Sequence, residues 1–201
     1  MVKRVVLNYR YFLREIKERM AGTFDFDRIM DSFKQDSLPP LHLWKPALSG
    51  DINIHIDKQG IWRHCGDEFK RLQIPKMFAR ILCKEGNEYF LKTPVEKWRI
   101  RVEDVPFFFI HMQRKELKKG IELSFVTITE DIVTLNEDHP IVLFNDQVSG
   151  EVFPYIHVRG AMYGKLSRNL YYELVALAEV DEDQQKLYIS SANQRFFLGD
   201  F

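Results

Sequence analysis

Apolar and polar residues follow a helical period at the start of the chain. Between residues 5 and 20, apolar side chains recur at steps of three and four, the spacing of one helical face. A second short helix is expected over residues 25–34, before Pro39 and Pro40 interrupt the pattern. We therefore predict that residues 1–38 form an N-terminal helical arm. Its basic polar side either touches an anionic surface or is the wet side of a helix packed on this domain or a second copy.

The period then changes to two. Ile52, Ile54 and Ile56 alternate with polar residues, which predicts a half-buried strand. Residues 57–60 carry turn chemistry, and residues 61–64 read as the returning strand of a hairpin.

A helix is expected next, because Pro75 suits a first helical turn and an apolar stripe runs from Ile74 to Leu82. Gly86 stands where a C-terminal cap is expected, and residues 88–92 follow as a strand. Short links favour antiparallel pairing among four further strands, over residues 96–102, 106–114, 121–128 and 132–135.

The last part of the chain repeats the same kinds of element. A strand over 152–158, a helix capped by Ser167 and two final strands at 186–190 and 195–198 are expected. Residues 54–91 and 156–189 show one order of elements: strand, glycine turn, arginine, helix, strand. This order favours a duplicated unit in a mainly antiparallel α+β fold.

Composition narrows the class of protein. The 201 residues contain 29 Lys plus Arg and 29 Asp plus Glu, so the net charge is zero and gives no global bias toward nucleic acid or an anionic membrane. Two cysteines, no signal-peptide pattern and no apolar run of roughly 20 residues predict a cytoplasmic protein without a membrane span.

The densest charge pattern lies in residues 93–104. Glu96 shares the inward parity of the apolar side chains, so it needs a partner, which is either a structural ion pair or a ligand. Lys97, Arg99 and Arg101 form a cationic stripe on the other face. This stripe either meets phosphates or an acidic partner, or is a solvated face neutralised by neighbouring acids.

Arg159 ends a strand beside a glycine turn. A guanidinium in such a place can bind phosphate or carboxylate.

Other chemistry finds little support in the sequence. His55, His64 and Cys65 lack the paired spacing of a zinc site, and no serine-hydrolase, kinase or P-loop motif occurs. No metal, cofactor or catalytic residue is therefore predicted.

Several motifs together resemble the bacterial domain-of-unknown-function family 1285, over about residues 39 to 180. The motifs are Pro39-Pro-Leu-His-Leu-Trp44-Lys-Pro46, Gly50-Asp51-Ile52, Trp62, Thr93-Pro-Val-Glu96, Arg101-Val-Glu-Asp104, Pro106-Phe107, Asp138-His-Pro140 and Pro154-Tyr-Ile-His-Val-Arg159. The chain departs from the family pattern at Gly66-Asp-Glu-Phe69.

This resemblance implies a duplicated α+β core whose C-terminal half is a pleckstrin-homology-like partial barrel. We accordingly expect an N-terminal repeat domain at 39–93 and a barrel-like C-terminal repeat domain at 94–201. It also implies a nucleotide-type ligand at the interface of the halves and a role in signalling. By motif, the residues expected near that interface are Asp51, Thr93, Glu96, Arg101, Asp104 and Arg159.

Three functions follow from these patterns. The first is a cytoplasmic, non-enzymatic binding module for an anionic nucleotide-like molecule, with Arg159 and Arg101 on phosphate. The second is a protein-interaction module. The third is an enzyme that uses Glu96 or Asp104 as general base.

Overall fold

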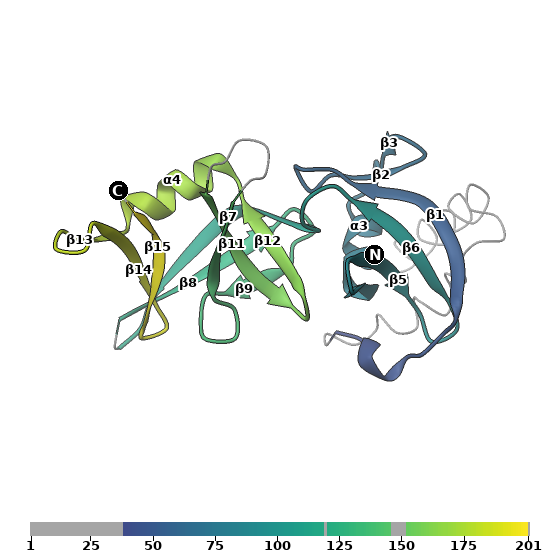
Figure 1. The fold of residues 1–201 in the computed structure, drawn as a ribbon, viewed down its shortest axis with the longest axis horizontal. Coiled ribbons are helices and arrows are strands. Elements are labelled where there is room, and N and C mark those ends of the chain that lie inside the picture. Colours follow the sequence, from purple (N-terminus) through teal and green to yellow (C-terminus); the bar gives the residue numbers. More distant parts are fainter. Residues whose placement is uncertain (1–37, 119, 146–151, 201) are drawn as a thin grey trace, which may run out of the picture.

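Two six-stranded sheets lie side by side along the long axis of the molecule (Figure 1). The computed structural model describes residues 38–118, 120–145 and 152–200. A third sheet of three strands lies beyond the second large sheet, at the far end of the molecule (Figure 1). The predicted arm at residues 1–38 falls, apart from its last residue, outside the described residues. The α+β fold with mainly antiparallel sheets is confirmed.

The first sheet follows a short 3-10 helix, Leu41–Leu43, and has the strand order β3-β2-β1-β6-β5-β4. Its strands are β1 (Leu48–Ile56), β2 (Trp62–His64), β3 (Asp67–Glu68), β4 (Leu82–Glu85), β5 (Glu88–Lys92) and β6 (Lys97–Val102). Neighbouring strands are antiparallel except the central pair β1 and β6, which is parallel.

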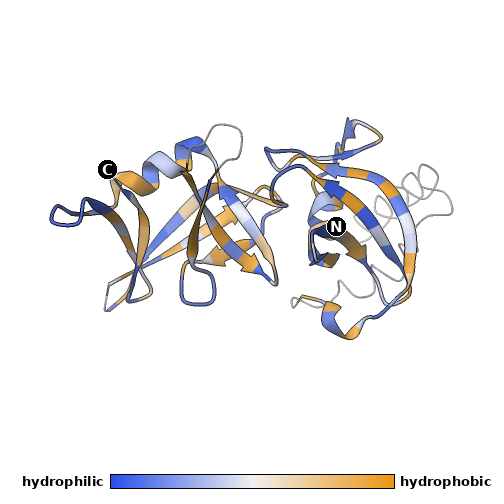
Figure 2. Ribbon diagram, in the orientation of Figure 1, coloured by the Kyte–Doolittle hydropathy of each residue, from blue (hydrophilic) through white to orange (hydrophobic). Residues whose placement is uncertain are grey.

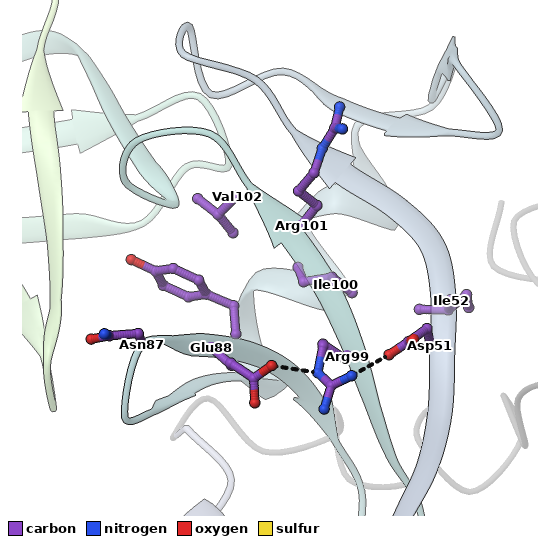
Figure 3. Close-up of a pocket in the computed structure, with 9 residues that line it drawn as sticks. Asp51, Ile52, Asn87, Glu88, Arg99, Ile100, Arg101 and Val102 are labelled. Carbon is purple, nitrogen blue, oxygen red and sulfur yellow. Dashed lines mark hydrogen bonds and ion pairs between the residues drawn. The ribbon is translucent and has the colours of Figure 1, made fainter. Parts of the chain in front are cut away.

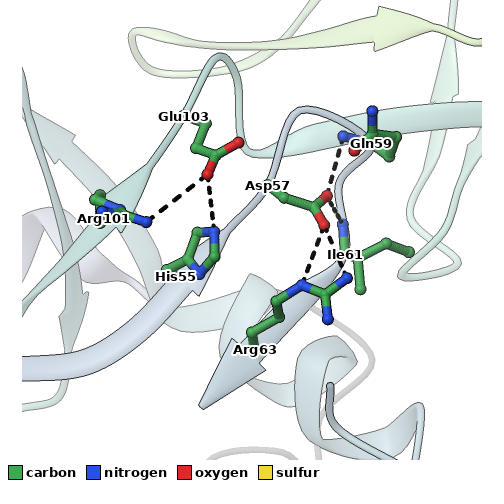
Figure 4. Close-up of polar contacts among 7 residues, drawn as sticks. All are labelled: His55, Asp57, Gln59, Ile61, Arg63, Arg101 and Glu103. Carbon is green, nitrogen blue, oxygen red and sulfur yellow. Dashed lines mark hydrogen bonds and ion pairs between the residues drawn. The ribbon is translucent and has the colours of Figure 1, made fainter. Parts of the chain in front are cut away.

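The predicted hairpin forms at the end of β1. The Asp57 carboxylate accepts the backbone N–H groups of Gln59 and Ile61 at 3.0 and 2.9 Å, which is the geometry of an Asx turn. The Arg63 side chain donates to the same carboxylate at 3.3 Å (Figure 4). Gly60 takes a φ of +76°, which glycine adopts without the Cβ clash.

Helix α3 (Gln73–Ile81) lies between β3 and β4 and confirms the predicted helix. Its apolar stripe is buried, and Phe78 stacks on Trp62 with 6.0 Å between ring centroids. The helix ends at Ile81 because the chain continues directly into β4, so Gly86 does not cap it. Gly86 instead takes a φ of +61° in the turn between β4 and β5.

The second sheet has the order β10-β11-β12-β7-β8-β9, and its central pair β7 and β12 is again parallel. The sheet curls into a half-barrel (Figure 1), which agrees with the expected partial barrel. Its strands are β7 (Phe107–Glu116), β8 (Ile121–Thr127), β9 (Ile132–Thr134), β10 (Ile141–Asn145), β11 (Val152–Arg159) and β12 (Met162–Leu166).

Duplication is confirmed, but the equivalent segments differ from those expected. Each sheet consists of two three-stranded meanders whose outermost strands in sequence pair at the centre. Residues 48–102 therefore correspond to residues 107–166, rather than 54–91 to 156–189. The expected alignment failed because it matched two helices. Helix α3 lies inside the first unit, whereas α4 (Arg168–Ala176) follows the second.

The strand β6 also moves the division between the halves. It pairs with β1 and β5 in the first sheet, so the chain passes to the second sheet between Val102 and Phe107, later than the boundary expected after residue 93. Residues 103–106 are the linker that joins the two halves.

The end of the chain closes the second half. Ser167 caps α4 as predicted, since its hydroxyl accepts the N–H of Leu170 at 3.3 Å. The third sheet is attached by Ser191, which is 1% exposed, donates to the Leu135 carbonyl at 2.8 Å and accepts the N–H of Leu123 at 3.0 Å. Its strands are β13 (Glu179–Asp181), β14 (Lys186–Ser191) and β15 (Gln194–Asp200).

Hydrophobic and hydrophilic residues alternate along the strands of both sheets (Figure 2). The apolar positions form a buried hydrophobic cluster with members from both halves, as the period-two pattern requires. The largest fully buried side chains include Trp62 and Phe78 in the first half and Phe107, Phe109 and Phe125 in the second.

Candidate functional site

The six predicted site residues fall into two groups. Asp104 and Arg159 lie where the two halves meet, and the other four belong to the first half. Within that half, Asp51 and Arg101 line one hollow, whereas Thr93 and Glu96 lie in the turn before β6.

The hollow lies on the first sheet and has a volume of about 340 Å³ (Figure 3). Strands β1 and β6 and the start of β5 supply its walls. A volume of this size lies at the lower end of the range for small-molecule sites. The lining residues are Asp51, Ile52, Asn87, Glu88, Tyr89, Arg99, Ile100, Arg101 and Val102.

Arg99 is held between two carboxylates on this face. Its Nη1 donates to Asp51 at 2.8 Å, and its Nε lies 2.8 Å from Glu88 (Figure 3). Two acids beside one guanidinium neutralise it. Each acid engages Arg99 through one named oxygen, Oδ1 of Asp51 and Oε1 of Glu88.

Arg101 is the most available cation of the hollow. Its side chain is 72% exposed, and its ion pair with Glu103 spans 3.8 Å. The same Glu103 oxygen lies 3.0 Å from Nε2 of His55, a closer partner (Figure 4). Because Glu103 is shared and the contact with Arg101 is long, the Arg101 guanidinium keeps donors available for an anion.

The rest of the cationic stripe is neutralised by acids. Lys97 donates to Glu85 at 2.8 Å and Lys92 donates to the same carboxylate at 2.9 Å. These hydrogen bonds, that of Lys97 first, lower the pKa of Glu85. Of the two interpretations of the stripe, a neutralised face therefore describes Lys97 and Arg99, and only Arg101 retains a weakly paired charge.

Thr93 and Glu96 form a tight turn. The Thr93 hydroxyl accepts the N–H of Glu96 at 3.0 Å, and the Thr93 N–H donates to the Glu96 carbonyl at 2.8 Å. Thr93 is 4% exposed, so its hydroxyl serves the turn. Oε2 of Glu96 is buried and has no hydrogen-bond partner among the described residues.

Arg159 joins the two halves. It lies 3.5 Å from Asp131 and stands over the Phe107 ring at 4.8 Å, both in the second half. Its Nη2 also donates to the carbonyl of Ala79 in the last turn of α3, where a cation is favoured by the helix dipole. Burial lowers the pKa of the Arg159 guanidinium, and the Asp131 charge opposes that shift.

Asp104 makes the second polar connection at this junction. It accepts the Tyr155 hydroxyl at 3.1 Å and the Lys165 ammonium at 3.1 Å. Burial, followed by the Asp104 charge, raises the pKa of Tyr155. For Lys165, burial lowers the pKa, but the hydrogen bond and charge of Asp104 outweigh it, so the net shift is upward. Asp104 is thus a paired structural acceptor rather than a free base.

The remaining candidate side chains do not gather into a metal site within the described residues. Within residues 38–118, 120–145 and 152–200, no three His, Cys, Asp or Glu side chains converge as metal ligands would. Cys65 is exposed and its sulfur lies 3.6 Å from Nε2 of His64. Burial raises the pKa of Cys83 to about 11, so this thiol stays protonated.

Sequence reasoning missed the contribution of β5 to the hollow. Asn87 and Glu88 line the hollow because β5 pairs with β6. This pairing brings the start of β5 beside the charged stripe on β6, from which it is separated in sequence. The turn signal at Gly86-Asn87 could have indicated an exposed rim. None of the described helices combines the length and the apolar character needed to cross a bilayer.

Comparison with known proteins identifies the family to which both halves of the chain are similar. Residues 39–105 match the N-terminal domain of the DUF1285 domain of unknown function, and residues 106–198 match its C-terminal domain. These ranges divide the chain within the linker, as the two sheets do. No curated protein matches the chain.

Two crystal structures resemble the chain. A DUF1285 family protein from Silicibacter pomeroyi DSS-3 shares 31% identity, covering 85% of this chain and 92% of that one, with a TM-score of 0.75. A DUF1285 family protein from Shewanella baltica OS155 shares 28% identity, covering 62% and 91%, with a TM-score of 0.50. The family matches span both halves, and the chain belongs to the DUF1285 family.

Proposed function

We propose that this chain is a cytoplasmic, non-enzymatic binding module that takes an anionic, nucleotide-like small molecule in the hollow of its first sheet. One observation carries the proposal. Arg101 presents an exposed guanidinium in the hollow, and its ion pair within the described part of the chain is long and shared. A guanidinium is well suited to grip a phosphate through two parallel hydrogen bonds.

The neighbouring groups suit the rest of such a ligand. Asp51 and Glu88 each place one oxygen on Arg99, which leaves Oδ2 and Oε2 as acceptors for hydroxyl groups. Asn87 adds an amide that both donates and accepts, and Ile52 and Val102 add apolar wall. A phosphate on Arg101 and a sugar hydroxyl on the carboxylates would therefore be recognised together.

The junction between the halves has a different role in this proposal. The polar groups of Arg159 and Asp104 bond Ala79, Asp131, Tyr155 and Lys165. These bonds hold the halves together, so the ligand is assigned to the hollow beside the junction rather than to the junction itself.

Isothermal titration calorimetry with AMP, adenosine and inorganic phosphate tests the proposal. We expect AMP to bind and adenosine to bind at least tenfold more weakly, because a charge-assisted contact contributes roughly 1.5 to 3 kcal/mol. Arg101→Ala is expected to reduce AMP affinity by a similar factor, without a change in the unfolding temperature.

Arg114→Ala is the matched control. Arg114 is also a strand arginine paired with a glutamate two residues later, at 3.9 Å, but it lies on β7, outside the hollow. Its replacement is expected to leave AMP binding unchanged. Equal AMP affinity in Arg101→Ala and the wild type, or no heat with AMP and phosphate alike, would overturn the proposal.

A further inference from the structure

His157 in β11 uses both of its ring nitrogens on carbonyl oxygens. Nδ1 lies 2.8 Å from the carbonyl oxygen of Asp138, and Nε2 lies 2.7 Å from that of Gly160. Both partners are acceptors without a proton to donate. The first precedes the strand β10, and the second lies in the turn between β11 and β12.

A neutral imidazole cannot satisfy this arrangement, because it carries one N–H group and one lone pair. In the neutral ring, one nitrogen lone pair would face a carbonyl lone pair at hydrogen-bond distance. The doubly protonated ring donates to both oxygens. We propose that His157 is a clasp whose doubly protonated ring ties the segment before β10 to the turn after β11.

The backbone of His157 belongs to the same network. Its N–H donates to the Pro140 carbonyl at 3.0 Å, and its carbonyl accepts Nδ1 of His139 at 3.1 Å. The segment is itself fixed, since the Asn136 side chain accepts the N–H groups of Asp138 and His139, each at 3.0 Å. These hydrogen bonds hold the segment that carries the Asp138 carbonyl against β11.

The contacts assign a different protonation form to each histidine. His139 donates from Nδ1, which its neutral Nδ1–H tautomer can do. The two rings stack with centroids 6.0 Å apart, so charging both would place like charges together. The Tyr163 ring makes a T-shaped contact with His157, with 5.5 Å between ring centroids. Of the charged residues nearby, Asp138 directly precedes His139, and Arg159 is engaged by Asp131 and by the Ala79 carbonyl.

The clasp acts beside the junction of the halves. Gly160 directly follows Arg159, whose guanidinium donates to Ala79 in α3. Opening the Nε2 contact releases the backbone that presents Arg159 to the first half. Loss of the His157 ring nitrogens is therefore expected to remove both contacts of the clasp and loosen the turn that carries Arg159.

Nitrogen-15 NMR of the imidazole groups in the full-length wild-type protein tests the assignment directly. In one and the same spectrum, we expect both His157 nitrogens to show the shifts of N–H groups while His139 shows the neutral Nδ1–H tautomer. A His157 ring with one unprotonated nitrogen in that spectrum would overturn the proposal.

A variant measures the consequence. In His157→Phe the aromatic contact with Tyr163 remains possible, but both donors are lost. The unfolding temperature of His157→Phe is expected to lie a few degrees below that of the wild type, while exposed His111→Phe stays at the wild-type value. Equal unfolding temperatures for the wild type and His157→Phe would also overturn the clasp.

Discussion

The two halves share one strand order, but Arg101 of the first half and two cations of the second lie in opposite surroundings. Arg101 stands exposed on a sheet face, and among the described residues its ion pair is the long one with Glu103. In the second half, Arg159 and Lys165 are 19% and 17% exposed, and each is held by an aspartate and lies over aromatic rings. Duplication thus preserved the backbone plan, while the chemistry on it diverged. In the proposed function, the first copy offers the surface for a ligand, while the second supplies the side chains that join the pair.

Two adjacent linker residues contact different halves of the molecule. The Glu103 carboxylate contacts His55 and Arg101 of the first half, and the Asp104 carboxylate contacts Tyr155 and Lys165 of the second. The Glu103 N–H also donates to the Ile56 carbonyl at 3.0 Å. Consecutive side chains therefore attach the linker to both halves, which favours unfolding of the molecule as one cooperative unit.

The largest effects are expected from cutting the core of either half. Phe78→Ala removes a fully buried ring from the first core and should cost about 3 to 5 kcal/mol of unfolding free energy. Leu174→Ala, in α4, should cost about 2 to 5 kcal/mol in the second. If the junction couples the halves, chemical denaturation followed by circular dichroism shows one shifted transition for each variant. Two separate transitions would show that the halves unfold independently.

Arg159→Met tests the junction itself. The variant keeps an apolar side chain over Phe107 but leaves Asp131 without its cation, and we expect a loss of about 3 kcal/mol, the low end for breaking a buried ion pair. Arg114→Met, at an exposed pair, serves as control and should stay within about 0.5 kcal/mol of the wild type. Urea denaturation of both variants compares them, and equal stabilities would remove the contrast drawn between buried and exposed arginines.

Alanine substitutions at two glycines with similar backbone angles distinguish backbone strain from a steric clash between the halves. Gly60 and Gly86 have φ of +76° and +61°, so alanine is strained at both. Only at Gly60 would the new methyl group meet the other half, 2.5 Å from Cβ of Phe108. We expect Gly60→Ala to be less stable than Gly86→Ala by about 1 to 3 kcal/mol. Thermal unfolding measures the difference, and matching melting temperatures would mean that the Gly60 contact yields freely.

The smallest effects are expected at the linker, where Asp104→Asn should cost about 1 to 2 kcal/mol because Lys165 loses its charged partner. Glu103→Gln, at an exposed site, should cost less than about 0.5 kcal/mol.

The pH dependence of the Asp104 variant has a defined sign. Since Asp104 raises the pKa of Lys165 in the folded state, the Lys165 contribution is complete below the ordinary lysine pKa and is lost as pH rises through the raised value. The difference between wild type and Asp104→Asn is therefore expected to stay constant between about pH 6 and 9 and to shrink in stronger alkali. Urea titrations at several pH values check this, and a difference that grows above pH 9 would contradict it.

Local patterns predicted individual elements better than their partners. Alternation located β1 and β8, and the cap at Ser167 located α4, because these signals depend on neighbouring residues. The strands β10 and β12 were missed. The run 141–145 is apolar without alternation, and β12 is short and contains Gly164, which packs against Phe109. Parallel pairing of β1 with β6 and β7 with β12 joins distant segments, so no local pattern contains it.

The sequence predicted which types of residue belong to the candidate site, but not how they are arranged in space. The charged stripe on β6 was visible as alternation, yet which of its members stays available depends on acids from β1, β5 and the β4–β5 hairpin. Arg101 and Arg159 look alike in sequence, each at or next to the end of a strand. The packing of α3 against the second half is what distinguishes the buried Arg159 from the exposed Arg101.

The parallel central strands give each half an entrance and an exit at opposite ends. The chain enters the first unit along β1, leaves along the neighbouring β6 in the same direction, and enters the second unit along β7 after residues 103–106. Such units can follow one another along a chain, because the last strand of one unit can lead directly into the first strand of the next. In this chain the exit after β12 is occupied by α4 and the third sheet. The described chain therefore continues from its second unit into a different kind of structure and not into a third copy of the unit.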